Sequence, residues 1–367
     1  MKSFPIVKIA GIGIELHSTF ILLVIIITGF LAIFSRETLF QTLTLFFLLF
    51  LSVALHELTH SLVASARGFK VRKIILLPIG GVALMDDFPK KPKDEFLISI
   101  AGPLFNFFLV FVIILTAQVF ALPFPWELFQ ENLGVGTFTE LFDFAIMNYP
   151  LFAFMWVNLI LGSFNLFVPA LPLDGGRVLR SILGLFFGFN KSTKIVAGVS
   201  FYLGAMLLVL GFLGGNLILA VIAIFIILGS KQENEVVLMH ESLGNVQIKD
   251  VYDDSALIMS SELSLEDAFN EMQERNETAF LVHLEGSIGI ITADKISGFK
   301  KSVRLKMKLK NAAELVPNVS LNANASDVLS KMLAKNYPLL PVVENYKIIG
   351  SVSLDKLQKA YELSKIE

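Results

Sequence analysis

The chain has 367 residues, of which 54% are hydrophobic and 17% charged, and its formal net charge is −2. Charged residues number 26 in residues 1–230, about 11%, but 36 in residues 231–367, about 26%. The second fraction is ordinary for globular domains and the first is far below it. Composition therefore predicts a membrane-embedded N-terminal part and a soluble C-terminal part, and argues against a nucleic-acid binder. Cysteine is absent, which excludes disulfides, thiolate nucleophiles and cysteine-based zinc sites.

The first 230 residues contain five long apolar runs: Ser18–Phe34, Phe40–Ala66, Phe96–Ala121, Ile146–Val168 and Ile195–Gly229. A spanning helix needs about 20 residues, so the last run, interrupted at 214–216, predicts two short helices and a total of six. Lys and Arg gather in alternate connections: the N-terminal tail, 67–93, 172–194 and position 231. Because positive residues mark the cytoplasmic side, we expect a multi-pass cell-membrane protein with both termini in the cytoplasm.

Two short strand pairs are expected outside the spans. Residues 5–15 bend at glycines 11 and 13, and Ile74–Met85 has strand propensity with a turn signal at Gly80-Gly81. The second hairpin either covers the cytoplasmic mouth of the membrane domain or receives an extended peptide along an edge strand.

The single carboxylate inside the predicted spans is Glu57, within the sequence His56-Glu57-Leu58-Thr59-His60. Histidines at i and i+4 share one helix face and can bind one metal ion, whereas Glu57 is rotated by about 100° and can approach a metal-bound water. Zinc lowers the pKa of such a water to about 7, and a nearby carboxylate can take its proton. The alternative is a chance match with two hydrogen-bonded histidines, but burying these groups in a membrane helix is expensive.

Catalytic zinc usually takes three protein ligands, and Asp174 is the favoured third candidate. Two prolines and two glycines break the helix between Asn165 and Gly176, and irregular backbone at membrane depth lines a cavity or is buried in protein. The spans that carry His60 and precede Asp174 run in the same direction, so both residues are expected near the same membrane face. A simple helix-capping role for Asp174 is the alternative.

These motifs together resemble the site-2 protease family of intramembrane zinc metalloproteases. The residues that carry the resemblance are His56-Glu57-x-x-His60, Asn165…Pro169…Asp174-Gly175, Gly80-Gly81, Ala101-Gly102-Pro103 and Ile14-Glu15-Leu16-His17. The resemblance implies one zinc ion bound by His56, His60 and Asp174, with Glu57 as general base.

The same resemblance implies that Asn165 assists at the site, by orienting the peptide or stabilising the oxyanion. It also implies that the Gly80-Gly81 hairpin guides an unwound segment of a single-span substrate. Such unwinding is necessary because a helix holds its carbonyl groups in i→i−4 hydrogen bonds.

The soluble part contains two similar stretches, about 245–300 and about 311–365, after a linker at 231–244. Six residues recur at a spacing of 60 or 61: Asp267, Met272, Gly289, Thr292, Asp294 and Lys295 match Asp327, Met332, Gly350, Ser353, Asp355 and Lys356. Each copy predicts an amphipathic helix (Ser264–Asn276; Ala325–Asn336), two strands and a further helix, and copies this small need each other to bury a core. The pattern resembles a tandem pair of cystathionine-β-synthase-type (CBS) domains.

The CBS resemblance implies an adenine nucleotide site, with candidate contacts at Thr292, Asp294, Ser353 and Asp355. In that family a ribose-binding Asp usually follows the Thr or Ser by three residues, where this chain has Lys295 and Lys356. Lysine cannot accept hydrogen bonds from ribose hydroxyls. The alternative is a pair that only dimerises or docks on the membrane domain, and face-to-face association makes a homodimer an expectation.

The sequence thus predicts a polytopic α-helical membrane protein with short β hairpins, residues 1–230, followed by a soluble α/β CBS pair, residues 245–367. The predicted function is intramembrane zinc endoproteolysis of a single-span substrate near the cytoplasmic side, with the CBS pair as a regulatory or dimerisation module. A CBS-regulated transporter or channel is the alternative, although an ion path would carry polar groups across the whole bilayer. A catalytically inactive scaffold is the third reading. The resemblance implies a prokaryotic setting.

Overall fold

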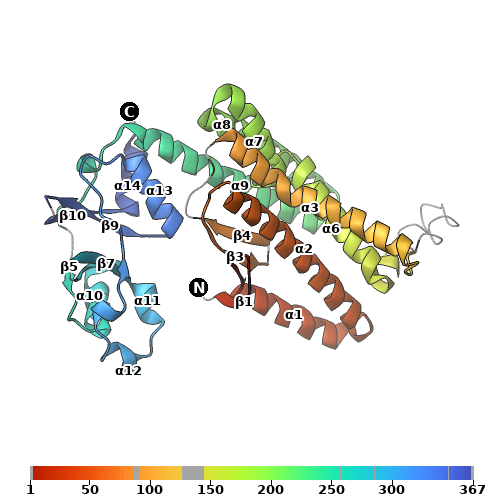
Figure 1. Ribbon diagram of the computed structural model, residues 1–367, viewed down its shortest axis with the longest axis horizontal. Helices are drawn as coiled ribbons and strands as arrows, with labels where there is room; N and C mark the ends of the chain where they lie inside the picture. Colours follow the sequence, from red (N-terminus) through yellow and green to blue (C-terminus); the bar gives the residue numbers. More distant parts are fainter. Residues whose placement is uncertain are drawn as a thin grey trace. The chain divides into compact units, whose positions relative to one another are not determined.

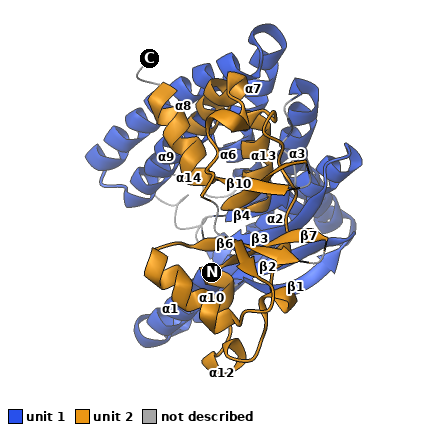
Figure 2. Ribbon diagram, turned by 90° about the vertical axis from the view of Figure 1, so that its left-hand side faces the viewer, with its two compact units in different colours: residues 1–234 blue, residues 235–367 orange. Residues whose placement is uncertain are grey.

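The computed structural model describes residues 3–78, 80–85, 89, 91–125, 144–255, 258–284, 286–345 and 347–364. The chain divides into two compact units, Met1–Asn234 and Glu235–Glu367, which Figure 2 colours separately. The segment 231–244, predicted as a linker, lies in helix α9 (Leu217–Ser242) and in the single 3-10 turn that follows it.

The first unit begins with a four-stranded sheet whose strand order is β1-β2-β3-β4. Its strands are β1 (Ser3–Ile9), β2 (Ile12–His17), β3 (Val71–Leu77) and β4 (Gly80–Met85). Strands β1 and β2 are antiparallel, and so are β3 and β4. The central pair, β2 and β3, runs parallel with Ile14 opposite Ile74. Both isoleucines are buried against Leu58 of helix α2 (Leu39–Ala66), so the sheet is fixed to the helix that carries the two histidines.

The second hairpin differs from the prediction in one respect. The sequence places its turn at Gly80-Gly81, but β3 ends at Leu77, before Pro78, and the two glycines are the first residues of β4. Proline cannot donate a ladder hydrogen bond, which accounts for the earlier end of β3. The glycine pair therefore lies within an edge strand, where Gly81 faces Glu57 of α2.

Six apolar helices make up most of the described part of the first unit. They are α1 (Ser18–Phe34), α2, α3 (Pro92–Val119), α6 (Pro150–Phe167), α8 (Phe189–Leu213) and α9. All except α1 are long and apolar enough to cross a membrane. Helix α1 has 17 residues, about 25 Å at 1.5 Å per residue, against a hydrocarbon core of about 30 Å. Helices α2, α3 and α6 pack against one another, as Figure 1 shows.

A further helix, α7 (Asp174–Phe187), occupies part of the connection 172–194, which the sequence treats as a cytoplasmic loop. With 14 residues α7 is too short to span a bilayer, and it is amphipathic, with Asp174, Arg180 and Ser181 buried. It packs against α3 and α8. The loop prediction is wrong here because Arg177 and Arg180, two of the positive residues used to assign the connection, belong to this helix, and Arg180 lies on its buried face.

The second unit contains two α/β repeats of the same order. The first comprises β5 (Ile258–Ser260), α10 (Leu265–Arg275), β6 (Ala279–Leu284), β7 (Ser287–Thr292) and α11 (Ala293–Ser297). The second comprises α13 (Ala325–Lys335), β9 (Leu339–Glu344), β10 (Lys347–Ser353) and α14 (Leu354–Ser364). Helix α12 (Lys301–Arg304) and strand β8 (Glu314–Leu315) connect them.

Local signals explain why α10 and α13 form where the sequence places them. Ser264 and Asn324 accept hydrogen bonds from the first turns, and Asn276 and Asn336 end the helices in the left-handed region, at φ +54° and +52°. The two repeats also share one core, in which Leu281 and Ile290 of the first lie with Leu329, Leu340 and Val352 of the second. Each repeat therefore completes the burial of the other.

Candidate metal centre

Three buried side chains from α2 and α7 converge on one point. His56 Nε2 lies 3.0 Å and His60 Nε2 3.1 Å from the same oxygen, Asp174 Oδ2, and the two nitrogens are 3.0 Å apart. The three residues are only 4%, 7% and 8% exposed. They form a group of donor atoms suited to a metal ion. The structure thus brings together the ligands that the sequence suggests, from segments more than a hundred residues apart.

The other nitrogen of each imidazole faces a hydrogen-bond acceptor. His60 Nδ1 lies 2.5 Å from the carbonyl oxygen of Ile98, and His56 Nδ1 lies 2.5 Å from Asn106 Oδ1. A neutral imidazole has one N–H, so both Nδ1 atoms donate and both Nε2 atoms carry lone pairs. Two lone pairs and a carboxylate oxygen about 3 Å apart repel one another unless positive charge lies between them. Two histidines and a carboxylate are also the ligands of many catalytic zinc sites, so the residues fit this metal.

A chain of hydrogen bonds across three helices fixes the orientation of Asn106. Asn158 Nδ2 donates to the carbonyl oxygen of Phe154 at 2.8 Å and to Ser52 Oγ at 3.0 Å. Asn158 Oδ1 therefore accepts from Asn106 Nδ2, at 2.7 Å, which turns Asn106 Oδ1 toward His56. Both asparagines and Ser52 are fully buried. The polarity of the chain, set by a backbone carbonyl, selects the tautomer of His56 that leaves Nε2 bare.

Sequence reasoning missed Asn106 and Asn158. The available signal was an asparagine in the middle of an otherwise apolar span, since polar groups at membrane depth are costly and are usually functional.

Two glycines allow the backbone to approach the cluster. A β-carbon at Gly102 of α3 would lie 2.4 Å from His60 Nε2 and 2.7 Å from His56 Cε1. A β-carbon at Gly175 would lie 2.4 Å from the carbonyl oxygens at the end of α6, those of Leu166 and Val168. Helix α3 thus closes one side of the site, and the first turn of α7 is held against the end of α6.

Glu57 lies between the histidines in sequence and beside β4 in space. A β-carbon at Gly81 would lie 2.4 Å from Glu57 Cγ, so any other residue at this position of the edge strand would have to displace the Glu57 side chain. Gly80 has a φ of +138°, which also favours glycine. Within the described part of the chain the Glu57 carboxylate makes no hydrogen bond or ion pair. A carboxylate without such partners is available to accept a proton.

Asn165 is not brought to the cluster by a hydrogen bond among the described residues. It lies on α6 and its amide donates to the carbonyl oxygen of Leu161 at 3.1 Å. Its role at the site stays a prediction.

A partly buried ion-pair cluster joins α7 to α3 and α9, and the sequence did not predict it. Arg180 Nε and Nη2 donate to Glu95 Oε1 at 2.8 and 2.5 Å, and its Nη1 donates to Glu233 Oε2 at 2.7 Å. Arg177 Nη2 donates to Glu233 Oε1 at 3.2 Å. Glu57 is still the single carboxylate of the apolar runs, but Glu95 and Glu233 lie just outside two of those runs. Helices α3 and α9 extend beyond their apolar runs and include Glu95 and Glu233, whose charges the arginines balance.

The candidate nucleotide contacts of the second unit have structural roles. Thr292 Oγ1 accepts from the backbone N–H of Lys295 at 3.4 Å, and Ser353 Oγ accepts from that of Lys356 at 3.2 Å. Each hydroxyl thus lies at the start of a helix, α11 or α14, whose first turn contains Asp294 or Asp355.

Lys295 and Lys356, which stand where the CBS family has its ribose-binding Asp, each lie near a carboxylate. Lys295 Nζ lies 3.9 Å from Glu314, and Lys356 Nζ lies 3.1 Å from Asp253 Oδ2. Hydrogen bonds from Ser255 and Lys356 lower the pKa of Asp253 to about 2. Nucleotide binding at this pair stays a prediction.

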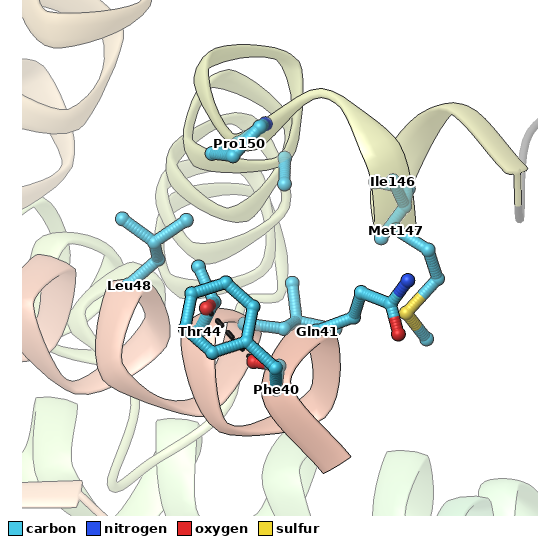
Figure 3. Close-up of a pocket in the computed structure, with 9 residues that line it drawn as sticks. Phe40, Gln41, Thr44, Leu48, Ile146, Met147 and Pro150 are labelled. Carbon is cyan, nitrogen blue, oxygen red and sulfur yellow. Dashed lines mark hydrogen bonds between the residues drawn. The ribbon is translucent and has the colours of Figure 1, made fainter. Parts of the chain in front are cut away.

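A separate pocket lies near the start of α2 (Figure 3). Its lining includes Phe40, Thr44 and Leu48 of α2 together with Ile146, Met147 and Pro150. Thr44 Oγ1 donates to the carbonyl oxygen of Phe40 at 2.8 Å, so this hydroxyl is satisfied within its own helix. The metal ligands do not line this pocket.

Comparisons with known proteins agree with this geometry. The family model of peptidase family M50 matches residues 44–211, which include both histidines, Glu57 and Asp174, and the CBS domain model matches residues 314–363. The chain is 35% identical over its whole length to a zinc metalloprotease of Methanocaldococcus jannaschii, of which it covers 98%. It is 26% identical, again over its whole length, to the putative zinc metalloprotease Rip3 of Mycobacterium tuberculosis, of which it covers 95%.

A solved structure, the site-2 protease from Methanocaldococcus jannaschii, is 41% identical and superposes with a TM-score of 0.45 over 64% of this chain and 95% of that chain. The full-length similarity to a zinc metalloprotease, the M50 match over the metal cluster and the five long apolar helices lead to one conclusion. The chain is a multi-pass membrane metalloprotease of peptidase family M50, the site-2 protease family, with CBS-domain sequence at its C-terminal end.

Proposed function

We propose that the protein is an intramembrane zinc endoprotease that hydrolyses a peptide bond in an unwound transmembrane segment of a single-span membrane protein. The observation that carries the proposal is the convergence of two bare Nε2 atoms and one carboxylate oxygen, His56, His60 and Asp174, beside the unpaired carboxylate of Glu57. These three residues would hold one zinc ion. When bound, zinc lowers the pKa of a coordinated water and polarises the scissile carbonyl.

The remaining chemistry belongs to the chain itself. Glu57 accepts the proton of the attacking water and returns it to the leaving amine, which is general base and then general acid catalysis. Asn106 keeps His56 in the tautomer that offers Nε2. Asn165 is proposed to orient the peptide or to stabilise the oxyanion; its NH2 group has two N–H donors, and the bond to the carbonyl oxygen of Leu161 uses one of them.

Strand β4 is proposed to bind the substrate by β-augmentation. Among the described residues it pairs with β3 alone, so its outer edge offers backbone donors and acceptors to an extended peptide. Gly80 and Gly81 begin this strand, and Gly81 lies against Glu57. A peptide paired there would have left the helical conformation that hides its carbonyls and would lie next to the general base.

The finer topology is also a proposal. We infer six spans, with α1 as the sixth, because this count places every Lys- and Arg-rich connection on one side. Both termini, the cut and the CBS pair would then be cytoplasmic, in a prokaryotic cell membrane. The CBS pair would act as a regulatory or dimerisation module. For adenine nucleotides, an unchanged melting temperature of the full chain in excess ATP, ADP and AMP would contradict binding.

The experiment is a comparison of Glu57→Gln with the parent protein, purified at full length and reconstituted with a model single-span substrate. Cleavage should fall by about 10²–10⁴-fold, the usual contribution of a general base, while zinc content stays at one per chain. Glu37→Gln, at an exposed glutamate of the first connection, is the matched control and should cleave normally. Cleavage by Glu57→Gln at the parent rate would end the proposal for Glu57, and stoichiometric tight zinc in Asp174→Ala would remove Asp174 as a ligand.

A further inference from the structure

The cluster of Arg177, Arg180, Glu95 and Glu233 begins three residues after the proposed third ligand. Asp174 is the first residue of α7, and Arg177 and Arg180 follow it at i+3 and i+6 on the same helix. Residues three apart on a helix are side-chain neighbours, with β-carbons about 5–6 Å apart. The Arg177 guanidinium is therefore close enough to the Asp174 carboxylate to compete for it.

The described contacts show what keeps the two apart. Arg177 Nη2 donates to Glu233 Oε1, while Arg177 Nε is buried and has no hydrogen-bond partner among the described residues. The Arg177 guanidinium is thus held by one ion pair, to Glu233, and its Nε–H is a donor without an acceptor among the described residues. Asp174 Oδ2 faces the two histidines and not the arginine.

Arg180 is held twice and has no such freedom. Its guanidinium bonds Glu95 through two nitrogens and Glu233 through the third, and Arg180 and Glu95 are 7% and 3% exposed. The four groups together carry no net charge. If Glu233 were neutral, Arg180 would keep Glu95, and Arg177 alone would lose its partner.

We propose that Glu233 is a positioning residue for the metal site, which holds Arg177 away from Asp174 and so leaves that carboxylate free for the metal ion. This inference rests on the proposed zinc site. Glu233 belongs to α9, which continues without interruption to Ser242, so the last long helix of the first unit supports a ligand located at the start of α7.

The test measures zinc release from the full-length protein in detergent under excess chelator, without substrate. Glu233→Gln should release zinc at least about tenfold faster than the parent, the lower range for groups that support a metal ligand. Glu235→Gln, two residues further along α9 and exposed, is the matched control and should release zinc at the parent rate. The double variant Arg177→Gln/Glu233→Gln should recover the slow rate, because the competing cation is gone and Arg180 keeps Glu95.

A role in stability alone predicts something different. In that case the double variant would release zinc as fast as Glu233→Gln. The metal-free forms of both variants would also melt at a lower temperature than the metal-free parent. Either that result, or parent-like zinc release by Glu233→Gln, would overturn the proposal. If Glu233→Gln does not fold, the comparison is between Arg177→Gln and the double variant. Both should hold zinc as the parent does, and faster release from the double variant alone would overturn the proposal. A parent protein that binds no zinc would refute the proposed function instead.

Discussion

Replacing Gly102 by alanine should displace a metal ligand by a distance that the structure defines. The added β-carbon would lie 2.4 Å from His60 Nε2, whereas ordinary van der Waals contact begins at 3.4 Å, so one of the two must move by about 1.0 Å. The same β-carbon would lie 2.7 Å from the Cε1 atoms of both His56 and His60, so the His60 ring cannot relieve the clash by moving toward His56. The opposite side of the His60 ring is held by the hydrogen bond from its Nδ1 to the carbonyl oxygen of Ile98.

A shift of this size is large for a zinc ligand, because acceptable ligand distances vary by only about 0.2 Å. We expect Gly102→Ala to weaken zinc binding by at least the roughly 100-fold that losing a strong supporting contact costs, and to abolish cleavage. Overpacking should also lower the free energy of unfolding by about 1–3 kcal/mol. Zinc affinity is measured by chelator competition with elemental analysis, and cleavage on a reconstituted single-span substrate.

Gly198→Ala is the matched control for this substitution. Gly198 lies within α8, and a β-carbon there would meet nothing within 4 Å. The variant should bind zinc and cleave as the parent does. Parent-like zinc affinity in Gly102→Ala would refute the reasoning, because the packing of α3 against the histidines would then not constrain the site.

Two further predictions follow from the polar contacts. Asn106→Leu removes the acceptor of His56 Nδ1 and should speed zinc release by about 10–100-fold, whereas Asn106→Asp keeps an acceptor oxygen and should hold zinc; equal release from the Leu variant and the parent would contradict the tautomer argument. In the second unit, Ser255 and Lys356 lower the pKa of Asp253 to about 2, below its unfolded value of about 3.9. Its stabilising contribution is therefore complete above about pH 4 and is lost as the pH falls through about 2. Because the ion pair is partly exposed, that contribution should be at most about 1 kcal/mol. Asp253→Asn should remove this part of the pH dependence of unfolding, measured by chemical denaturation between pH 5 and 2, and an unchanged curve would count against it.

Features that depend on local spacing could be predicted from the sequence. The i, i+4 histidines lie on one face of α2 because helix geometry requires it, and the breakers between Asn165 and Gly176 do end α6, although helix α7, which begins at Asp174, was not predicted. In the second unit, polar caps and left-handed asparagines limit α10 and α13 to the predicted residues, within one position.

Features that depend on how helices are rotated against one another could not be predicted. Helices α3 and α6 are apolar on almost every side, so their hydrophobic pattern does not say which face meets α2. Asn106 and Asn158 meet only because the helices adopt one particular rotation. The first turn of α3 and the last turns of α9 could not be predicted either. A search for apolar residues stops at the first charges, whereas these helices include Glu95 and Glu233.

Glu95 and Glu233 sharpen the argument for Glu57 as the general base. Burial inside the protein does not by itself mark a general base, since Glu95 is buried as well. The distinction is the hydrogen-bond partner: Glu95 and Glu233 each accept hydrogen bonds from Arg180, whereas Glu57 has no hydrogen-bond donor among the described residues. A carboxylate bound by a guanidinium gives up that stabilisation when it accepts a proton, so it is a poor base. Glu57 has no such hydrogen bond to give up, and the glycine at position 81 leaves room for its side chain beside the strand proposed to bind the peptide.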